Sequence, residues 1–151
     1  MLIGNIEIEG STNLNLLLNK LGLILYLVVL ISYGHSLYGY LPQNVRLNYN
    51  LFIINSFLII AVILTQNVIY ETNEMHESSI YALISIYLLY AFLYIIAFPA
   101  KTLRSIEMGR EAKLVNYIGI FFMIIFWPFC IWFTQSRVNK IADQDKSILE
   151  N

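Results

Sequence analysis

The sequence predicts an all-α integral membrane protein, with four hydrophobic helices and no soluble domain. Of the 151 residues, 58% are hydrophobic and only 13% are charged, whereas soluble domains carry about 25% charged residues. Residues 21–99 contain only four formal charges, Arg46, Glu71, Glu74 and Glu77. The intervening runs are apolar on all sides and approach the roughly 20 residues that cross a bilayer. Residues 1–151 are therefore expected to form one membrane domain.

The first hydrophobic segment is predicted at about residues 21–41 and is closed by Pro42. A polar-apolar tail precedes it, with a short interfacial helix expected over residues 14–18. This tail contains Glu7 and Glu9, and no small-residue cleavage site follows the segment. Cleaved signal peptides have a basic start and such a site, so we expect a retained span.

The second and third segments are predicted at about residues 51–70 and 80–98. The third is expected to end at Pro99, because proline removes a backbone hydrogen bond inside a helix. A cytoplasmic linker, residues 99–113, then leads to a fourth segment at about 114–133 and a polar tail, 134–151.

The fourth segment contains Pro128 and has two interpretations: a Pro-kinked spanning helix, or a re-entrant segment that returns to the same face. Four crossings would place five Lys and Arg residues on one face and four on the other. A re-entrant fourth segment would place eight on one face and one on the other. Only the second arrangement gives the cytoplasmic excess of positive charge typical of membrane proteins.

Several polar residues fall within the first two predicted spans, where unpaired polar groups are costly. Those of the first span lie on one helical face, and the pair Ser32 and Ser36 would permit close helix approach. These groups either line a water path or hydrogen-bond between helices, and His35 alternatively lies at headgroup level in an aromatic belt. The set is Ser32, His35, Ser36, Asn55, Thr65, Gln66 and Asn67. Such polar faces favour a homo-oligomer. A third-span stripe of Tyr87, Tyr90 and Tyr94 is expected to serve packing.

The linker is predicted to form a short helix with an ion-pair ladder through Arg104, Glu107, Arg110 and Glu111. Its four cations, Lys101, Arg104, Arg110 and Lys113, have two interpretations. They anchor the chain at lipid headgroups, or they form a gating surface for an anionic nucleotide or oligonucleotide.

The sequence gives no basis for catalysis. No Asp or Glu falls within a predicted span, and no metalloprotease, phosphate-loop or dinucleotide motif is present. His76 and Cys130 are isolated, so neither a disulfide nor a metal site is expected. We expect a protein without a cofactor that is not an enzyme.

The run FPAKTLRSIEMGREAKLVNYIGIFFMIIFWPFCIWFTQSRVNKI, residues 98–141, resembles the C-terminal half of a set of small bacterial inner-membrane proteins from Bacteroidetes-like genomes. Their pattern reads K-S-I-E-x-G-R-E-A-K, then F-F, then P-x-x-I-W and Q-x-R-x-N-K. This sequence departs with Arg104 in place of Lys, and with residues 134–136 in place of a Gln-Pro step. The resemblance covers under a third of the chain. It implies a multi-pass protein of the bacterial inner membrane and no particular mechanism.

Two functions are consistent with these features. The first is an oligomeric membrane pore or ion channel in the lipid bilayer, by analogy a gated effector of a bacterial anti-phage system. The alternative is a non-catalytic membrane scaffold or accessory subunit, in which every polar group serves helix packing.

Overall fold

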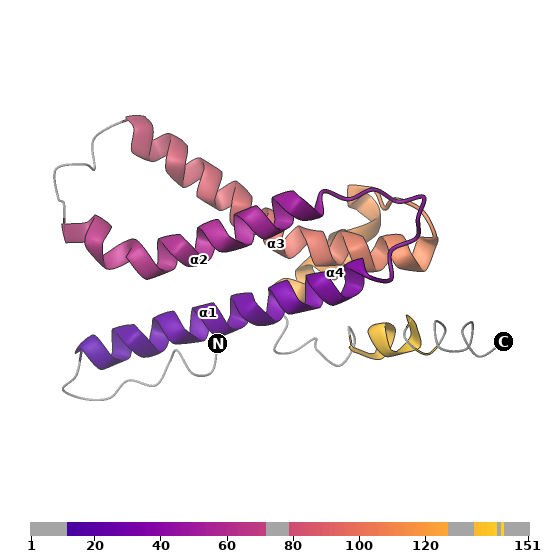
Figure 1. The fold of residues 1–151 in the computed structure, drawn as a ribbon, viewed down its shortest axis with the longest axis horizontal. Coiled ribbons are helices and arrows are strands. Elements are labelled where there is room, and N and C mark those ends of the chain that lie inside the picture. Colours follow the sequence, from indigo (N-terminus) through magenta and orange to yellow (C-terminus); the bar gives the residue numbers. More distant parts are fainter. Residues whose placement is uncertain (1–11, 72–78, 127–134, 142, 144–151) are drawn as a thin grey trace. The chain divides into compact units, whose positions relative to one another are not determined.

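A computed structural model describes residues 12–71, 79–126, 135–141 and 143. Within these ranges the regular secondary structure is all helical, as predicted, and contains no strand. Four helices follow one another, α1 (Thr12–Tyr38), α2 (Tyr49–Glu71), α3 (Ser79–Met108) and α4 (Leu114–Ile125) (Figure 1). A further helical segment covers residues 135–141. The chain divides into a first unit, residues 1–32 and 49–95, and a second unit, residues 33–48 and 96–151.

Helix α1 begins at Thr12 rather than near residue 21 and ends at Tyr38 rather than near residue 41. The leucines between positions 14 and 18 are strong helix formers, and no breaker separates them from the apolar run that follows. The short interfacial helix predicted there is therefore continuous with the span. At the other end, the Tyr40 and Leu41 amides bond back to the Leu37 and Tyr38 carbonyls, forming a turn before Pro42.

Helix α3 continues through Pro99, so the predicted end of the third segment was wrong. A proline at this position removes one helical hydrogen bond. However, Pro99 is fully buried and its neighbours Phe98, Ala100 and Leu103 are buried with it. Because this packing holds both flanking turns, the helix reaches 30 residues, about 45 Å in length. Residues 99–108 of the predicted linker therefore belong to α3.

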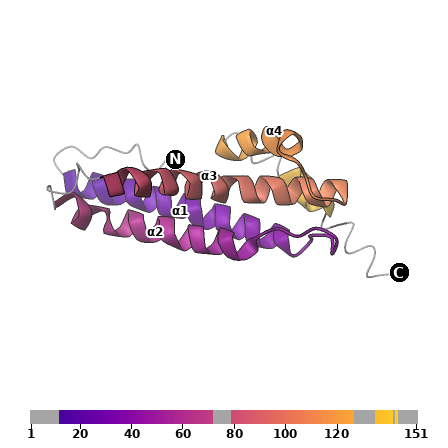
Figure 2. The ribbon, with the colours of Figure 1, turned by 90° about the horizontal axis from the view of Figure 1, so that it is seen from above.

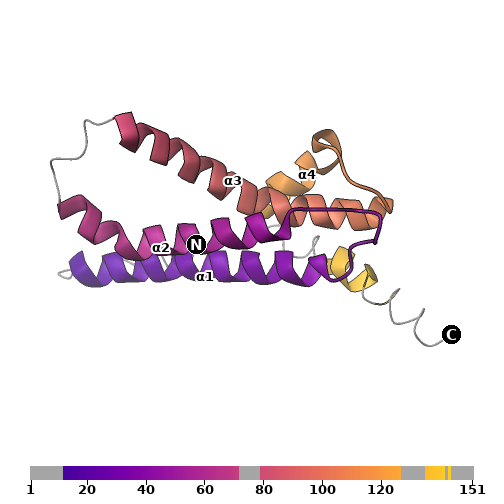
Figure 3. The same ribbon diagram turned by 45° about the horizontal axis from the view of Figure 1, so that its top comes forward.

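The first unit packs the α1 residues Leu27 and Leu30, the α2 residues Phe52 and Ile59, and the last turns of its α3 portion, where Ala91 and Ile95 are fully buried. Toward Ser79, α3 diverges from α2 (Figure 3). Residues 82–90 are exposed or nearly so at every position, with Leu83 68% and Ile86 65% exposed. Apart from Ser85 and the hydroxyls of Tyr87 and Tyr90, the side chains of this part of α3 are apolar.

In the second unit, α4 folds back beside the C-terminal part of α3 (Figure 2) and buries Ile120 and Ile124. It has 12 residues, about 18 Å, whereas the sequence predicted a segment to about residue 133. The Phe126 amide closes the helix on the Phe122 carbonyl (3.0 Å). Helices commonly end shortly before a proline, but Pro128 itself lies outside the described residues.

The connection between α3 and α4 is a tight, hydrogen-bonded turn. Gly109 has a φ of +63°, in the left-handed region that glycine adopts at helix ends. The Ala112 amide donates to the Ser105 hydroxyl (3.0 Å), which donates to the Lys101 carbonyl (2.7 Å). The Asn44 side chain donates to the Gly109 carbonyl (2.9 Å). The turn is thereby fixed to α3 and to the α1–α2 connection.

Candidate functional site

The predicted polar face of α1 is exposed. Ser32, His35 and Ser36 all lie on the outside of the chain, whereas Leu30, Gly34 and Leu37 are buried. Both members of the small-residue pair, Ser32 and Ser36, are therefore exposed in the described part of the chain. The role of this pair between chains, or along a water path, stays a prediction.

The predicted polar residues of α2 do not share one environment. Asn55 is fully buried, and its side-chain oxygen accepts a hydrogen bond of 2.9 Å from the Tyr87 hydroxyl of α3. Its Nδ2 has no hydrogen-bond partner within the described part of the chain. Asn55 therefore joins two helices of the first unit and does not face outward.

The hydroxyl groups of Ser56 and Thr65 on α2 bond to their own helix. The Ser56 hydroxyl donates to the Phe52 carbonyl (2.7 Å) and the Thr65 hydroxyl to the Ala61 carbonyl (2.9 Å). Such bonds satisfy the hydroxyl without a second helix. The side chains of Gln66 and Asn67 lie outside the described residues.

The tyrosine stripe on α3 is a continuous row of rings. Ring centroids lie 6.1 Å apart between Tyr87 and Tyr90 and 5.9 Å apart between Tyr90 and Tyr94, within the range of favourable aromatic pairs. The stripe serves packing, as predicted, but Tyr87 also provides the hydroxyl that Asn55 accepts. Sequence reasoning placed these two residues on separate helices without pairing them.

The predicted ion-pair ladder is correct only in its first step. Arg104 contacts Glu107 at 2.8 Å, but Gly109 turns the chain before Arg110, which lies outside the helix. Glu111 instead contacts Lys101 at 2.6 Å across the turn. Two of the four predicted anion-binding cations, Lys101 and Arg104, are therefore occupied by carboxylates of the same chain.

The remaining linker cations are exposed. Arg110 and Lys113 form no ion pair within the described residues. Arg46, two residues beyond Asn44, and Lys140 are also exposed. The described residues of the second unit contain seven Lys and Arg residues against three Asp and Glu residues. The described part of this unit is therefore basic.

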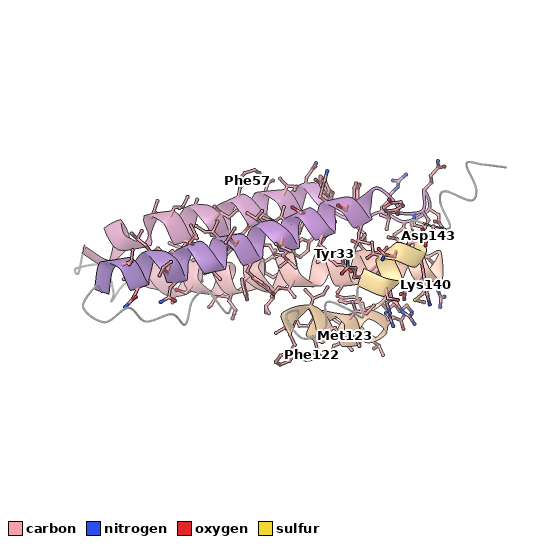
Figure 4. All side chains as sticks on the ribbon, turned by 90° about the horizontal axis from the view of Figure 1, so that it is seen from below. Tyr33, Phe57, Phe122, Met123, Lys140 and Asp143 are labelled. Atoms are coloured by element: carbon pink, nitrogen blue, oxygen red, sulfur yellow. The ribbon has the colours of Figure 1, made fainter. Side chains whose placement is uncertain are left out.

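The helical segment 135–141 lies against the end of α3. Arg137 contacts Glu107 at 3.4 Å, so Glu107 bridges two arginines from different elements. Figure 4 labels Lys140 of this segment, and Asp143 just beyond it. The C-terminal segment 135–141 therefore lies beside the end of α3, next to the α3–α4 turn, within the second unit.

Two hydrogen bonds of the second unit were not predicted from the sequence. Ser105 accepts the Ala112 amide, and Asn44 reaches Gly109 across 65 positions of sequence. A glycine just past a helical run is a recognised helix-end pattern, so Gly109 could have located the end of α3.

No group of three His, Cys, Asp or Glu side chains that could hold a metal lies among the described residues. Two helical stretches there, Leu14–Tyr38 and Ala82–Met108, are long and apolar enough to cross a membrane. No known protein family, curated protein or solved structure matches this chain.

Proposed function

We propose that the chain is a multi-pass protein of the bacterial inner membrane in which α1, α2 and α3 cross the bilayer and α4 is re-entrant. The two long apolar helices support the first and third crossings, and α2, with 23 residues, is long enough for the second. Helix α4, with 12 residues, is shorter than the roughly 20 that a crossing requires. The Arg137–Glu107 contact supports the return to the same face.

This topology gives the chain a clear orientation. The α1–α2 connection, the α3–α4 turn and the C-terminal segment fall on one side, with eight of the nine Lys and Arg residues. Lys20 alone lies toward the other side, in the N-terminal part of α1. The excess of positive charge favours a cytoplasmic location for these connections and the C-terminal segment.

Within this membrane protein, we propose an oligomeric pore or ion channel whose subunits meet, or whose path is lined, at the polar face of α1. The observation that carries the proposal is the exposure of Ser32 and Ser36, one turn apart on a helix long enough to cross a bilayer. Polar groups facing hydrocarbon are costly, so a neighbouring subunit or water is the favourable surrounding. The apolar α3 surface at residues 82–90 supports contact with lipid on another side.

The test is ion flux from liposomes containing the purified protein, with and without added nucleotides. Ser32→Leu and Ser36→Leu should each lower the flux at least about tenfold and reduce the oligomer seen by cross-linking. Ile86→Leu, on the exposed α3 surface proposed to contact lipid, is the control and should leave both unchanged. Absence of flux from the unmodified protein under every condition would refute the pore.

The alternative, a scaffold or accessory subunit, is supported by the Asn55–Tyr87 bond, because there a polar group at depth serves packing alone. It predicts co-purification of a second chain in stoichiometric amount after gentle detergent extraction. A homo-oligomer that conducts without any other chain would exclude it.

The role of gated anti-phage effector remains an analogy within the pore proposal. It requires an anionic signal at the linker, where Lys101 and Arg104 are paired with carboxylates. Arg110 and Lys113 are the cations left to meet such a signal.

A further inference from the structure

We infer that the re-entrant α4 is a lipid-facing helix whose preceding cations recognise anionic headgroups: its apolar stripe contacts the acyl region, and the cations at its start meet the lipid phosphates. The inference rests on the membrane location proposed above but not on conduction. It concerns the second unit alone, and it names a lipid class as the partner of this unit.

The outer face of α4 is a continuous apolar stripe. Val115, Ile118, Phe122 and Phe126 recur at offsets of three, four and four residues and are all exposed, Val115 by 82%. This spacing puts them on one helical face. Phe122 points away from the neighbouring helix (Figure 4), while Ile120 and Ile124 are buried on the opposite side. The stripe has no covering element among the described residues.

The length and tethering of α4 restrict what can cover this stripe. At about 18 Å, the helix reaches little more than half of the roughly 30 Å hydrocarbon core. The hydrogen bonds of the α3–α4 turn hold its start beside α3. The helix itself carries no charged side chain, so its exposed apolar side is suited to the acyl region, while the cations at its start are suited to the lipid headgroups.

The charge around α4 specifies the kind of lipid. Arg110 and Lys113 directly precede the helix and are exposed. The carboxylates Glu107 and Glu111 are each engaged by cations of the same unit, so they do not neutralise this pair. Cations at a membrane surface attract acidic lipids.

The same charge argues against a second copy of the chain on this face. Two such units would bring together surfaces in which basic residues exceed acidic ones, seven to three in the described part. Like charges repel at close approach. An anionic bilayer surface offers complementary charge and an apolar interior at once.

Lipid selectivity can be measured with the full-length protein in phosphatidylcholine bilayers containing trace spin-labelled phosphatidylglycerol or phosphatidylcholine. Electron paramagnetic resonance reports the fraction of each lipid immobilised by the protein. The unmodified protein should prefer phosphatidylglycerol several-fold. Arg110→Gln with Lys113→Gln should remove most of this preference. The control, Lys101→Gln with Glu111→Gln, removes an ion pair without changing the net charge and should keep it.

Two further measurements test whether the bound phosphate belongs to a lipid and whether lipid covers the apolar stripe of α4. Inorganic phosphate or ATP, compared with chloride at equal ionic strength, should not displace phosphatidylglycerol. A spin label at Phe122→Cys, in a Cys130→Ser background, should be more accessible to oxygen than to a water-soluble nickel chelate.

Three results would overturn the inference: equal immobilisation of both lipids, displacement by free phosphate or ATP, or dipolar broadening that places two Phe122→Cys labels of neighbouring copies together. If a variant does not fold by circular dichroism, the comparison of lipids and the phosphate competition on the unmodified protein still decide. Flux from the same vesicles separates the two proposals, since lipid preference without flux refutes only the pore.

Discussion

The Tyr87 hydroxyl of α3 donates a hydrogen bond of 2.9 Å to the side-chain oxygen of Asn55 on α2. Asn55 is fully buried and 32 positions away in sequence. This polar contact joins the two helices within the first unit, where the other buried residues of α2 and α3 are mainly apolar. The bond gives α2 and α3 a specific register that apolar packing alone specifies less sharply.

Tyr87→Phe should destabilise the protein by about 1–2 kcal/mol, because it leaves the buried Asn55 oxygen without its donor. Tyr90→Phe makes the same chemical change one turn away, on an exposed ring, and should cost less than about 0.5 kcal/mol. Unfolding in mixed micelles by titration with sodium dodecyl sulfate, followed by circular dichroism, measures both. Equal losses in the two variants would contradict a specific role for the bond.

Gly109→Ala and Gly119→Ala should have opposite signs. Gly109 has a φ of +63°, so alanine there should cost roughly 1–2 kcal/mol of backbone strain, although no atom lies within 4 Å of the added Cβ. Gly119 lies within α4 with open space around it, so alanine should stabilise by up to about 1 kcal/mol. Thermal unfolding in detergent tests this, and a stabilising Gly109→Ala would refute the assigned turn.

Ser105→Ala should cost about 1–3 kcal/mol, since it leaves the buried Ala112 amide without an acceptor. Thr102→Val is the matched control. The Thr102 hydroxyl only donates to the Phe98 carbonyl of its own helix (2.8 Å), so its loss should cost less than about 1 kcal/mol. Amide hydrogen exchange at Ala112 should accelerate in the first variant only. Unchanged protection there would show that another group accepts this bond.

The re-entrant topology predicts the side from which single cysteines can be labelled. In a Cys130→Ser background, Lys113→Cys and Lys140→Cys should react with an impermeant maleimide from the same side of inner-membrane vesicles, because Arg137 contacts Glu107. Glu74→Cys, in the connection between α2 and α3, should react from the opposite side. Labelling of positions 113 and 140 from opposite sides would establish a fourth crossing.

The helices could be predicted because hydrophobic periodicity and charge depletion are local properties. Their ends were less predictable. Pro99 suggested a helix end, yet α3 continues because Phe98, Ala100 and Leu103 are buried around it, and burial depends on elements distant in sequence. Helix propensity likewise extended α1 back to Thr12 without a boundary at residue 21.

In the candidate sites, too, contacts between neighbours in sequence could be predicted, whereas contacts between distant residues could not. The Arg104–Glu107 pair was predicted because both residues lie one turn apart on one helix. The Lys101–Glu111 and Arg137–Glu107 contacts depend on how the chain turns at Gly109 and returns after α4. Ser32, His35 and Ser36 were correctly placed on one face, but no sequence pattern could tell whether that face packs inside the chain.

The five-residue turn at residues 109–113, between Met108 and Leu114, also has a consequence for biosynthesis. A stretch of this length spans at most about 20 Å when fully extended, and its internal hydrogen bonds shorten it further. In the proposed topology, the start of α4 therefore lies in the same leaflet as the end of α3. In that topology the insertion of α3 also sets the leaflet of α4, without a separate topogenic signal.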